Sequence, residues 1–149
     1  EVNYPTEEEE LQIAKKTGGF EDAKVEPVLS GESILQFQKI IRKIPVPEHI
    51  YEYVTKLVRN TRPQLPNSPE WVKKSVAWGA GPRAVQYLIL GARAHAALSG
   101  SYMVRIEDIR AIAKEVLAHR IQLSFQAESE GQSSVDVVER LVQETEIQS

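Results

Sequence analysis

The chain has 149 residues, which is long enough for one domain with a buried core, and its shares of hydrophobic (42%) and charged (26%) residues are typical of a globular protein. The net charge of −3 argues against a nucleic-acid-binding domain, which usually carries a basic excess, and the absence of cysteine excludes disulfides and thiolate metal sites. No apolar run is long enough to span a bilayer and no secretory signal is present, so we expect a cytoplasmic setting without membrane insertion. The sequence opens on Glu1 rather than Met, so we expect a fragment of a longer protein.

The first expected helix covers residues 7–16 and follows an extended segment, residues 1–5, that would end a strand. Thr6 and Glu9 have the spacing of a capping box at the start of this helix. Acidic residues fill the first turn and lysines fill the last, which suits the helix dipole. Gly18 and the glycine after it should end the helix.

Two amphipathic helices are expected next, after a connector over residues 20–29. The first covers residues 31–43 with Ser30 as its cap, and the second covers residues 47–60. Apolar residues recur at helical spacing and predict one apolar stripe on each helix: Ile34, Phe37, Ile41 and Ile44 on the first, and Ile50, Tyr53, Val54, Leu57 and Val58 on the second.

The proline-rich residues 62–69 are expected to form a surface loop, followed by a short helix that carries Trp71 and Val72. A long helix is expected over residues 82–98. Because apolar residues occur almost all the way round it, we expect this helix to be central and buried. Small residues would let a neighbouring helix approach it closely: Gly91, Ala92 and Ala96.

The last part of the chain predicts a helix over residues 107–118, a short strand over residues 120–123, and a final helix that ends near Glu144. Ser133 and Asp136 have the spacing of a capping box for the final helix. The polar residues between the strand and this helix are expected to be exposed. The elements add up to six or seven helices with a few short extended segments, so the predicted fold class is mainly α, a compact helical bundle.

The sequence contains no self-sufficient catalytic apparatus. It lacks a phosphate-binding loop, a serine nucleophile elbow, and an apolar strand that ends in paired acids for magnesium. The three histidines, His49, His95 and His119, are too scattered to indicate a zinc-binding helix.

The segment "WGAGPRA", residues 78–84, places an arginine where a cation is normally unfavourable. Gly79 and Gly81 predict a loop, and Pro82 suits the first position of a helix, so Arg83 occupies the second. In one interpretation the glycines shape a tight turn and Arg83 pairs with a surface acid. In the other, an anion binds at the helix start, where free N–H groups and the guanidinium converge on it.

The hexapeptide "GAGPRA" resembles the sensor-2 motif of AAA+ ATPases, in the Gly-Ala-Ser-Pro-Arg-Ala form of the MoxR group. Three other segments are similar to the same group: "YPTEEEELQI" resembles the join between the ATPase core and its lid, "VPEHIYEYVTKLVRNTR" the helix before the long loop of the lid, and "YMVRIEDIRAIAKEVLAHRIQL" the segment that closes the lid. Together they cover residues 2–125 in order. The resemblance implies the C-terminal helical lid of a MoxR-type AAA+ ATPase, with residues 1–5 as the end of the core and residues 6–149 as the lid.

By this resemblance, a core domain of the same polypeptide would bind ATP and hold its Mg²⁺, and Arg83 would contact the γ-phosphate and couple the position of the lid to the state of the nucleotide. The chemistry would be phosphoryl transfer to water, which positioned cations promote. The full-length protein would form a homo-oligomeric ring, commonly a hexamer, that acts like a chaperone on client proteins. The residues that would line the nucleotide pocket are Gly79, Ala80, Gly81 and Pro82.

Two positions depart from the pattern of the group. Gly81 replaces the frequent serine, so capping by a hydroxyl is lost at a cost of a few tenths of a kcal/mol. Arg105 stands where the group often has a threonine or serine cap.

Several other residues have a structural and a functional interpretation. His119 and Arg120 follow a helix end, where cations are favoured, and could instead lie at a subunit interface. Arg59 and Arg62 either complement the negative end of the preceding helix dipole or face a phosphate or a neighbouring subunit. For Trp78, as for Trp71, packing in the core is favoured over stacking on a nucleotide base.

A stand-alone helical protein-interaction module is the alternative function. It predicts a large exposed apolar groove that is unrelated to Arg83.

Overall fold

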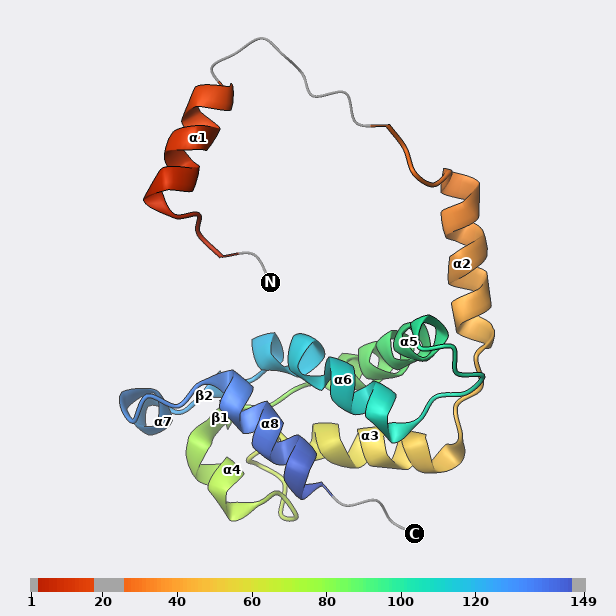
Figure 1. Ribbon diagram of the computed structural model, residues 1–149. Coiled ribbons are helices and arrows are strands. Elements are labelled where there is room, and N and C mark those ends of the chain that lie inside the picture. The colour runs from red at the N-terminus through yellow and green to blue at the C-terminus, as the bar shows by residue number, and fades with distance from the viewer. Residues whose placement is uncertain (1–2, 18–25, 146–149) are drawn as a thin grey trace.

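Eight α-helices, one 3₁₀ turn and a two-stranded ribbon make up the described residues, 3–17 and 26–145, of this computed structural model (Figure 1). This confirms the mainly α fold class. The elements in chain order are α1 (Glu7–Thr17), α2 (Gly31–Lys43), α3 (Glu48–Asn60), α4 (Glu70–Ser75), β1 (Val76–Trp78), α5 (Pro82–Leu98), α6 (Ile106–Leu117), η1 (Ala118–Arg120), β2 (Gln122–Leu123), α7 (Phe125–Ser129) and α8 (Ser134–Glu144).

The core lies between α3, α5, α6 and α8, and α6 packs along α5 over most of its length (Figure 1). The apolar stripe predicted on α3 is buried along its whole length. Full burial of one such side chain stabilises a fold by about 1.5–3 kcal/mol, so this four-helix core provides most of the stability. Its largest fully buried side chains are Ile50, Leu57, Leu88, Ile109, Leu117 and Leu141.

Helix α5 has the predicted bounds but is not buried all round. One face contacts α3 and α6 and is buried, whereas Tyr87, Leu90 and Leu98 on the rest of the helix are exposed. The prediction of a fully buried helix was therefore wrong, because no described segment covers that side apart from the end of α2. The expected close approach is confirmed at Gly91, where a Cβ atom would lie 2.7 Å from Cδ1 of Ile112.

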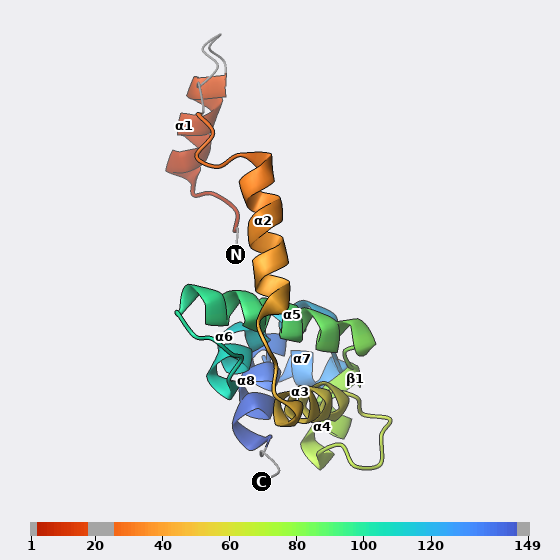
Figure 2. The ribbon, with the colours of Figure 1, turned by 90° about the vertical axis from the view of Figure 1, so that its right-hand side faces the viewer.

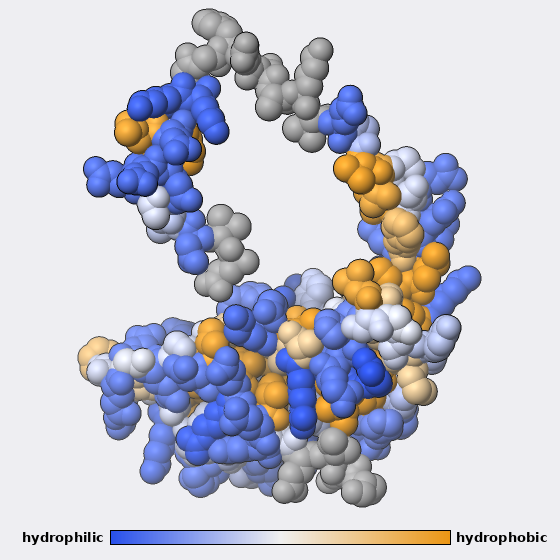
Figure 3. Space-filling model, in the orientation of Figure 1, coloured by the Kyte–Doolittle hydropathy of each residue, from blue (hydrophilic) through white to orange (hydrophobic). Residues whose placement is uncertain are grey.

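Helix α2 projects from the four-helix core, and helix α1 lies apart from that core (Figures 1 and 2). Both caps are as predicted: Glu9 Oε2 accepts from the Thr6 N–H at 2.8 Å, and Ser30 Oγ accepts from the Ser33 N–H at 3.1 Å. The expected end of α1 at Gly18 lies outside the described residues. The apolar stripe of α2 is not fully buried anywhere, and Figure 3 shows orange surface on this helix. Four large apolar residues of α2 are exposed: Ile34, Leu35, Phe37 and Ile40.

Two short elements were not predicted. Strand β1 pairs antiparallel with β2, with Val76 opposite Leu123, whereas only the second of these strands was expected. Helix α7 lies in the stretch that was expected only to be polar and exposed, and its start is capped by Ser124 Oγ, which accepts from the Ala127 N–H at 3.2 Å. In the described part of the chain, no helix is long and apolar enough to cross a membrane.

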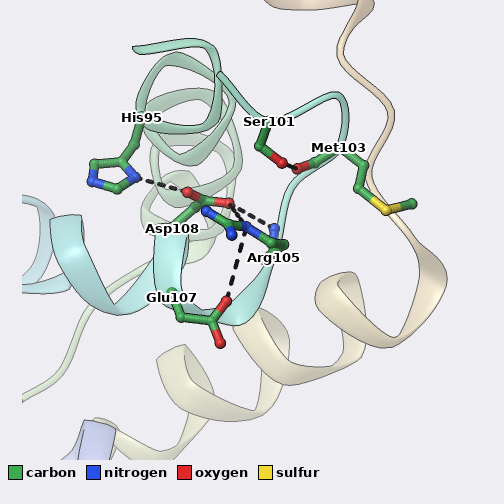
Figure 4. A network of polar contacts seen from close by, with 6 residues as sticks. All are labelled: His95, Ser101, Met103, Arg105, Glu107 and Asp108. Carbon is green, nitrogen blue, oxygen red and sulfur yellow. Dashed lines mark hydrogen bonds and ion pairs between the residues drawn. The ribbon is translucent and has the colours of Figure 1, made fainter. Parts of the chain in front are cut away.

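A buried carboxylate joins α5 to the start of α6 (Figure 4). Asp108 is fully buried, and its Oδ1 accepts from Nδ1 of His95 at 2.8 Å. Its Oδ2 accepts from the backbone N–H of Arg105 at 2.8 Å and lies 3.5 Å from the Nε of the same residue. Burial pulls the pKa of Asp108 upward, but the hydrogen bonds from His95 and Arg105 outweigh it and hold that pKa below its ordinary value. The ionised carboxylate therefore acts as the polar anchor of this junction.

Candidate functional site

The loop before α5 is held by two residues at the end of α3. The Ala80 N–H donates to Oγ1 of Thr61 at 2.9 Å, and Nε of Arg62 donates to the Ala80 carbonyl at 2.8 Å. Thr61 is itself fixed, because its hydroxyl donates to the Val58 carbonyl at 2.7 Å. The backbone N–H and the carbonyl of Ala80 both pair with residues that directly follow α3, so the loop has a defined conformation.

Gly79 allows this loop to lie against the backbone of α3. A Cβ atom at Gly79 would lie 2.5 Å from the carbonyl carbon of Thr61 and 2.8 Å from Cα of Arg62, and closer still to the Thr61 carbonyl oxygen. These neighbours are backbone atoms that cannot rotate away. Gly81 is different: a Cβ atom there would meet nothing within 4 Å, and its φ of −81° suits any residue.

Arg83 lies at the N-terminus of α5, as predicted, with an exposed side chain. Among the described residues it forms no ion pair or hydrogen bond through its guanidinium, and the first turn of α5 contains no acid. The interpretation that Arg83 pairs with a surface acid therefore has no support in the described residues. The first N–H groups of any helix also lack intrahelical acceptors, so the start of α5 combines the Arg83 cation with free N–H donors.

The two tryptophans have different environments. Trp71 is partly buried against the core, and its Nε1 donates to Oε2 of Glu144 at 2.7 Å while Arg140 lies 4.2 Å above the ring centre. Core packing is thus confirmed for Trp71. It was wrong for Trp78, whose side chain is 67% exposed directly beside the clamped loop.

The other basic candidates have mostly structural roles. Arg120 donates to the Val116 carbonyl at the end of α6 and lies 5.0 Å from the ring centre of Tyr87, which confirms the capping and packing interpretation. His119 is exposed beside it. Arg59 is exposed in the last turn of α3. The role of Arg62 in holding the loop was not predicted, since contact between residues 18 positions apart leaves no local signal in the sequence.

Two open grooves lie elsewhere on the surface. One, of about 530 Å³, follows α3 and the loop at residues 65–68, and the other, of about 560 Å³, lies between α2, α5 and α6. Neither includes Arg83, so the candidate site is an open corner of this chain that another part of a protein would have to close. The described residues contain no group of three or more histidine, aspartate or glutamate side chains that could hold a metal ion.

A serine in place of Gly81 is expected to stabilise the chain slightly. We expect Gly81→Ser to raise the free energy of unfolding by a few tenths of a kcal/mol, because serine is a better N-cap than glycine and the side chain meets no obstacle. Chemical denaturation of the 149-residue chain measures this. A loss of stability would mean that the loop does not have the open, extended conformation seen at Gly81.

Comparisons with known proteins point to one family. Residues 69–141 match the family model of the AAA lid domain. The chain is 32% identical over 142 residues to Chaperone MoxR1 of Mycobacterium tuberculosis, and this match covers 95% of this chain and 37% of that protein. It is 48% identical over 48 residues to Protein MoxR of Methylorubrum extorquens, and this match covers 32% of this chain and 14% of that protein. A crystal structure of an ATPase candidate from Cytophaga hutchinsonii has a TM-score of 0.79 at 28% identity, covering 99% of this chain and 45% of that chain. The chain thus spans less than half the length of each of these proteins.

Proposed function

Because this chain belongs to the AAA lid domains of the MoxR type, we propose that it is the lid of a longer ATP-hydrolysing protein in which Arg83 senses the γ-phosphate of bound ATP. In this proposal residues 1–5 end the ATPase core, and residues 6–149 form the lid. In the same proposal, the core would bind ATP with its Mg²⁺.

The observation that carries the proposal is that Arg83, exposed in the first turn of α5 directly after the clamped loop, forms no ion pair or side-chain hydrogen bond among the described residues. A guanidinium placed there without an acid raises the positive potential of the helix start, which is unfavourable until an anion binds. A phosphate group provides that anion, and the planar fork of arginine suits its oxygens.

Clamping of the loop also supports a coupling role. The backbone N–H and carbonyl of Ala80 bind Thr61 and Arg62, so a displacement of Arg83 would move α3 and α5 together, and these helices belong to the four-helix core. When the γ-phosphate is bound, Arg83 would hold the lid toward the core, and loss of that phosphate on hydrolysis would release it. The guanidinium would also stabilise the negative charge on the transferred phosphoryl group.

The test is ATP hydrolysis by the complete polypeptide with Arg83→Ala. We expect kcat to fall at least tenfold, with the ATP affinity reduced more than the ADP affinity, because only ATP has the γ-phosphate. Arg110→Ala removes an exposed arginine on α6 and is the matched control, with hydrolysis expected to be unchanged. Equal hydrolysis by the two variants, with an unchanged circular dichroism spectrum, would refute the role of Arg83.

For the whole protein we further propose a cytoplasmic, homo-oligomeric ring, commonly hexameric in this group, with chaperone-like action on client proteins. The name of the relative Chaperone MoxR1 supports the chaperone-like action. The mass of the complete protein with and without ATP, measured by light scattering, tests the ring: a monomer under both conditions would refute it.

The alternative, a stand-alone interaction module, also expects an exposed apolar surface, and the face of α2 provides one. The AAA lid match and the similarity to MoxR proteins favour the lid. The gene sequence upstream of residue 1 separates the two: a phosphate-binding loop in the same reading frame supports the lid, and a start codon next to residue 1 supports the module.

A further inference from the structure

Trp78 combines a fixed backbone with a free side chain. It is the last residue of β1, where it lies opposite Gln122 of β2, and the next residue is the tightly packed Gly79. Trp78 is nevertheless 67% exposed, so most of the surface of this tryptophan, one of two in the chain, does not pack against the fold. A tryptophan on a rigid backbone loses little conformational freedom when it contacts a ligand, which makes it an effective flat recognition surface.

The surroundings of Trp78 favour a small planar ligand over a protein surface. Its exposed neighbours along the chain are Ala77, Gly81 and Pro82, which are small, whereas docking surfaces for proteins are broad apolar patches. The exposed apolar residues of this chain gather instead on α2. Trp78 is thus an exposed aromatic residue whose exposed chain neighbours are small, close in sequence to the cationic start of α5.

We propose that Trp78 stacks on the base of the nucleotide whose phosphates reach Arg83. This inference rests on the proposed function and adds the part of the ligand that the lid would recognise. Arg83 follows Trp78 by five positions, so the chain could place them up to about 17 Å apart when extended, and the clamped turn holds them within that limit. A nucleoside triphosphate fits within such a span. At Gly81, between the two, a Cβ atom would meet nothing, which leaves room for a ligand to pass along the loop.

Trp78 and Arg83 would recognise different parts of the nucleotide. Stacking uses the face of the ring and tolerates different bases, so Trp78 contributes to the affinity for ADP and ATP equally. Arg83 distinguishes ATP from ADP. A phosphate chain without a base would contact Arg83 and leave Trp78 unused.

The experiment is calorimetric titration of the complete protein with ADP, ATP and inorganic tripolyphosphate. For Trp78→Ala we expect the affinities for ADP and ATP to fall about tenfold, within the range for loss of one base–aromatic stack, and the affinity for tripolyphosphate to stay unchanged. Trp78→Phe retains an aromatic face and should keep both nucleotide affinities within about threefold of the wild type. Trp71→Phe is the matched control and should leave all three affinities unchanged, because Trp71 is occupied by Glu144 and Arg140.

Three results would overturn the proposal. Unchanged ADP affinity in Trp78→Ala would show that no stack forms, and the proposed function would stand if Arg83→Ala still lost hydrolysis. An equal loss for tripolyphosphate would show that Trp78 acts only by shaping the loop. A smaller assembly mass with unchanged affinities would assign Trp78 to a subunit contact. If Arg83→Ala also leaves hydrolysis unchanged, the proposed function falls with the stacking.

Discussion

Replacement of Asp108 by alanine is expected to lower the free energy of unfolding of the 149-residue chain by about 3 kcal/mol, which is typical for the loss of one partner from a buried charged pair. The carboxylate is fully buried and binds His95 together with the backbone and side chain of Arg105. Its removal leaves the Arg105 N–H without its acceptor and removes the link between α5 and α6 (Figure 4).

The matched control is Asp136→Ala at the start of α8. Asp136 has the same position in its helix, and its Oδ2 accepts from the Ser133 N–H at 2.7 Å, but it is exposed and has no histidine partner. Loss of such an exposed cap costs about 1 kcal/mol. Urea denaturation of both variants measures the difference. Equal losses would show that the burial of Asp108 and its bond to His95 add nothing to stability.

The pH dependence of Asp108 provides a second measurement of the same effect. Its folded pKa is lowered, so its contribution is fully present above the unfolded value of about 4 and is lost as the pH falls through the folded value. We expect Asp108→Asn to be less stable than the wild type at pH 7, and the difference in the free energy of unfolding to narrow below pH 4. A difference that stays constant from pH 7 to pH 3 would show that the charge of Asp108 is not what stabilises the junction.

Gly79→Ala is expected to destabilise the chain by about 3 kcal/mol and to displace the loop that carries Arg83. The added methyl group would overlap the backbone of Thr61 and Arg62, and overpacking against rigid atoms costs about 1–3 kcal/mol or more. The Ala80 bonds to the same two residues would also be stretched. Denaturation of the 149-residue chain gives the stability, and hydrolysis by the complete protein reports on the site.

Gly81→Ala, two residues further on, makes the same chemical change in open space. We expect it to lower the free energy of unfolding by only about 0.5 kcal/mol, because the loss of glycine as the better N-cap is partly offset by the lower conformational freedom of alanine in the unfolded chain. If the two variants lost the same stability, the close contact at Gly79 would not be the cause.

Helices with a complete local signal could be predicted closely from the sequence. The bounds of α2 and α5 match the expected ranges, because Ser30 caps the first and Pro82 starts the second, and such preferences act within one turn of the chain. Helix α7 was missed because five residues are too few to show a helical period. Strand β1 was missed because it exists through its pairing with β2, more than 40 residues later.

Burial was the weaker part of the prediction. The periodicity of α2 is that of a helix with a covered face, yet Ile34 and Phe37 are exposed because no described segment lies over them. Trp78 was expected in the core and is exposed. A hydrophobic pattern indicates that a face suits burial, but what covers it depends on the rest of the fold.

The sequence by itself determined the mainly α class, the positions of the long helices, the arginine at the start of α5 and the resemblance to the MoxR lid, because caps, periodicity and motifs depend on residues within a few positions of one another. Only the tertiary structure decided that Thr61 and Arg62 clamp the loop, that His95 reaches Asp108, and that Arg83 has no partner among the described residues. These contacts join residues 13 to 19 positions apart. They exist because the packing of the four-helix core brings those helix ends together.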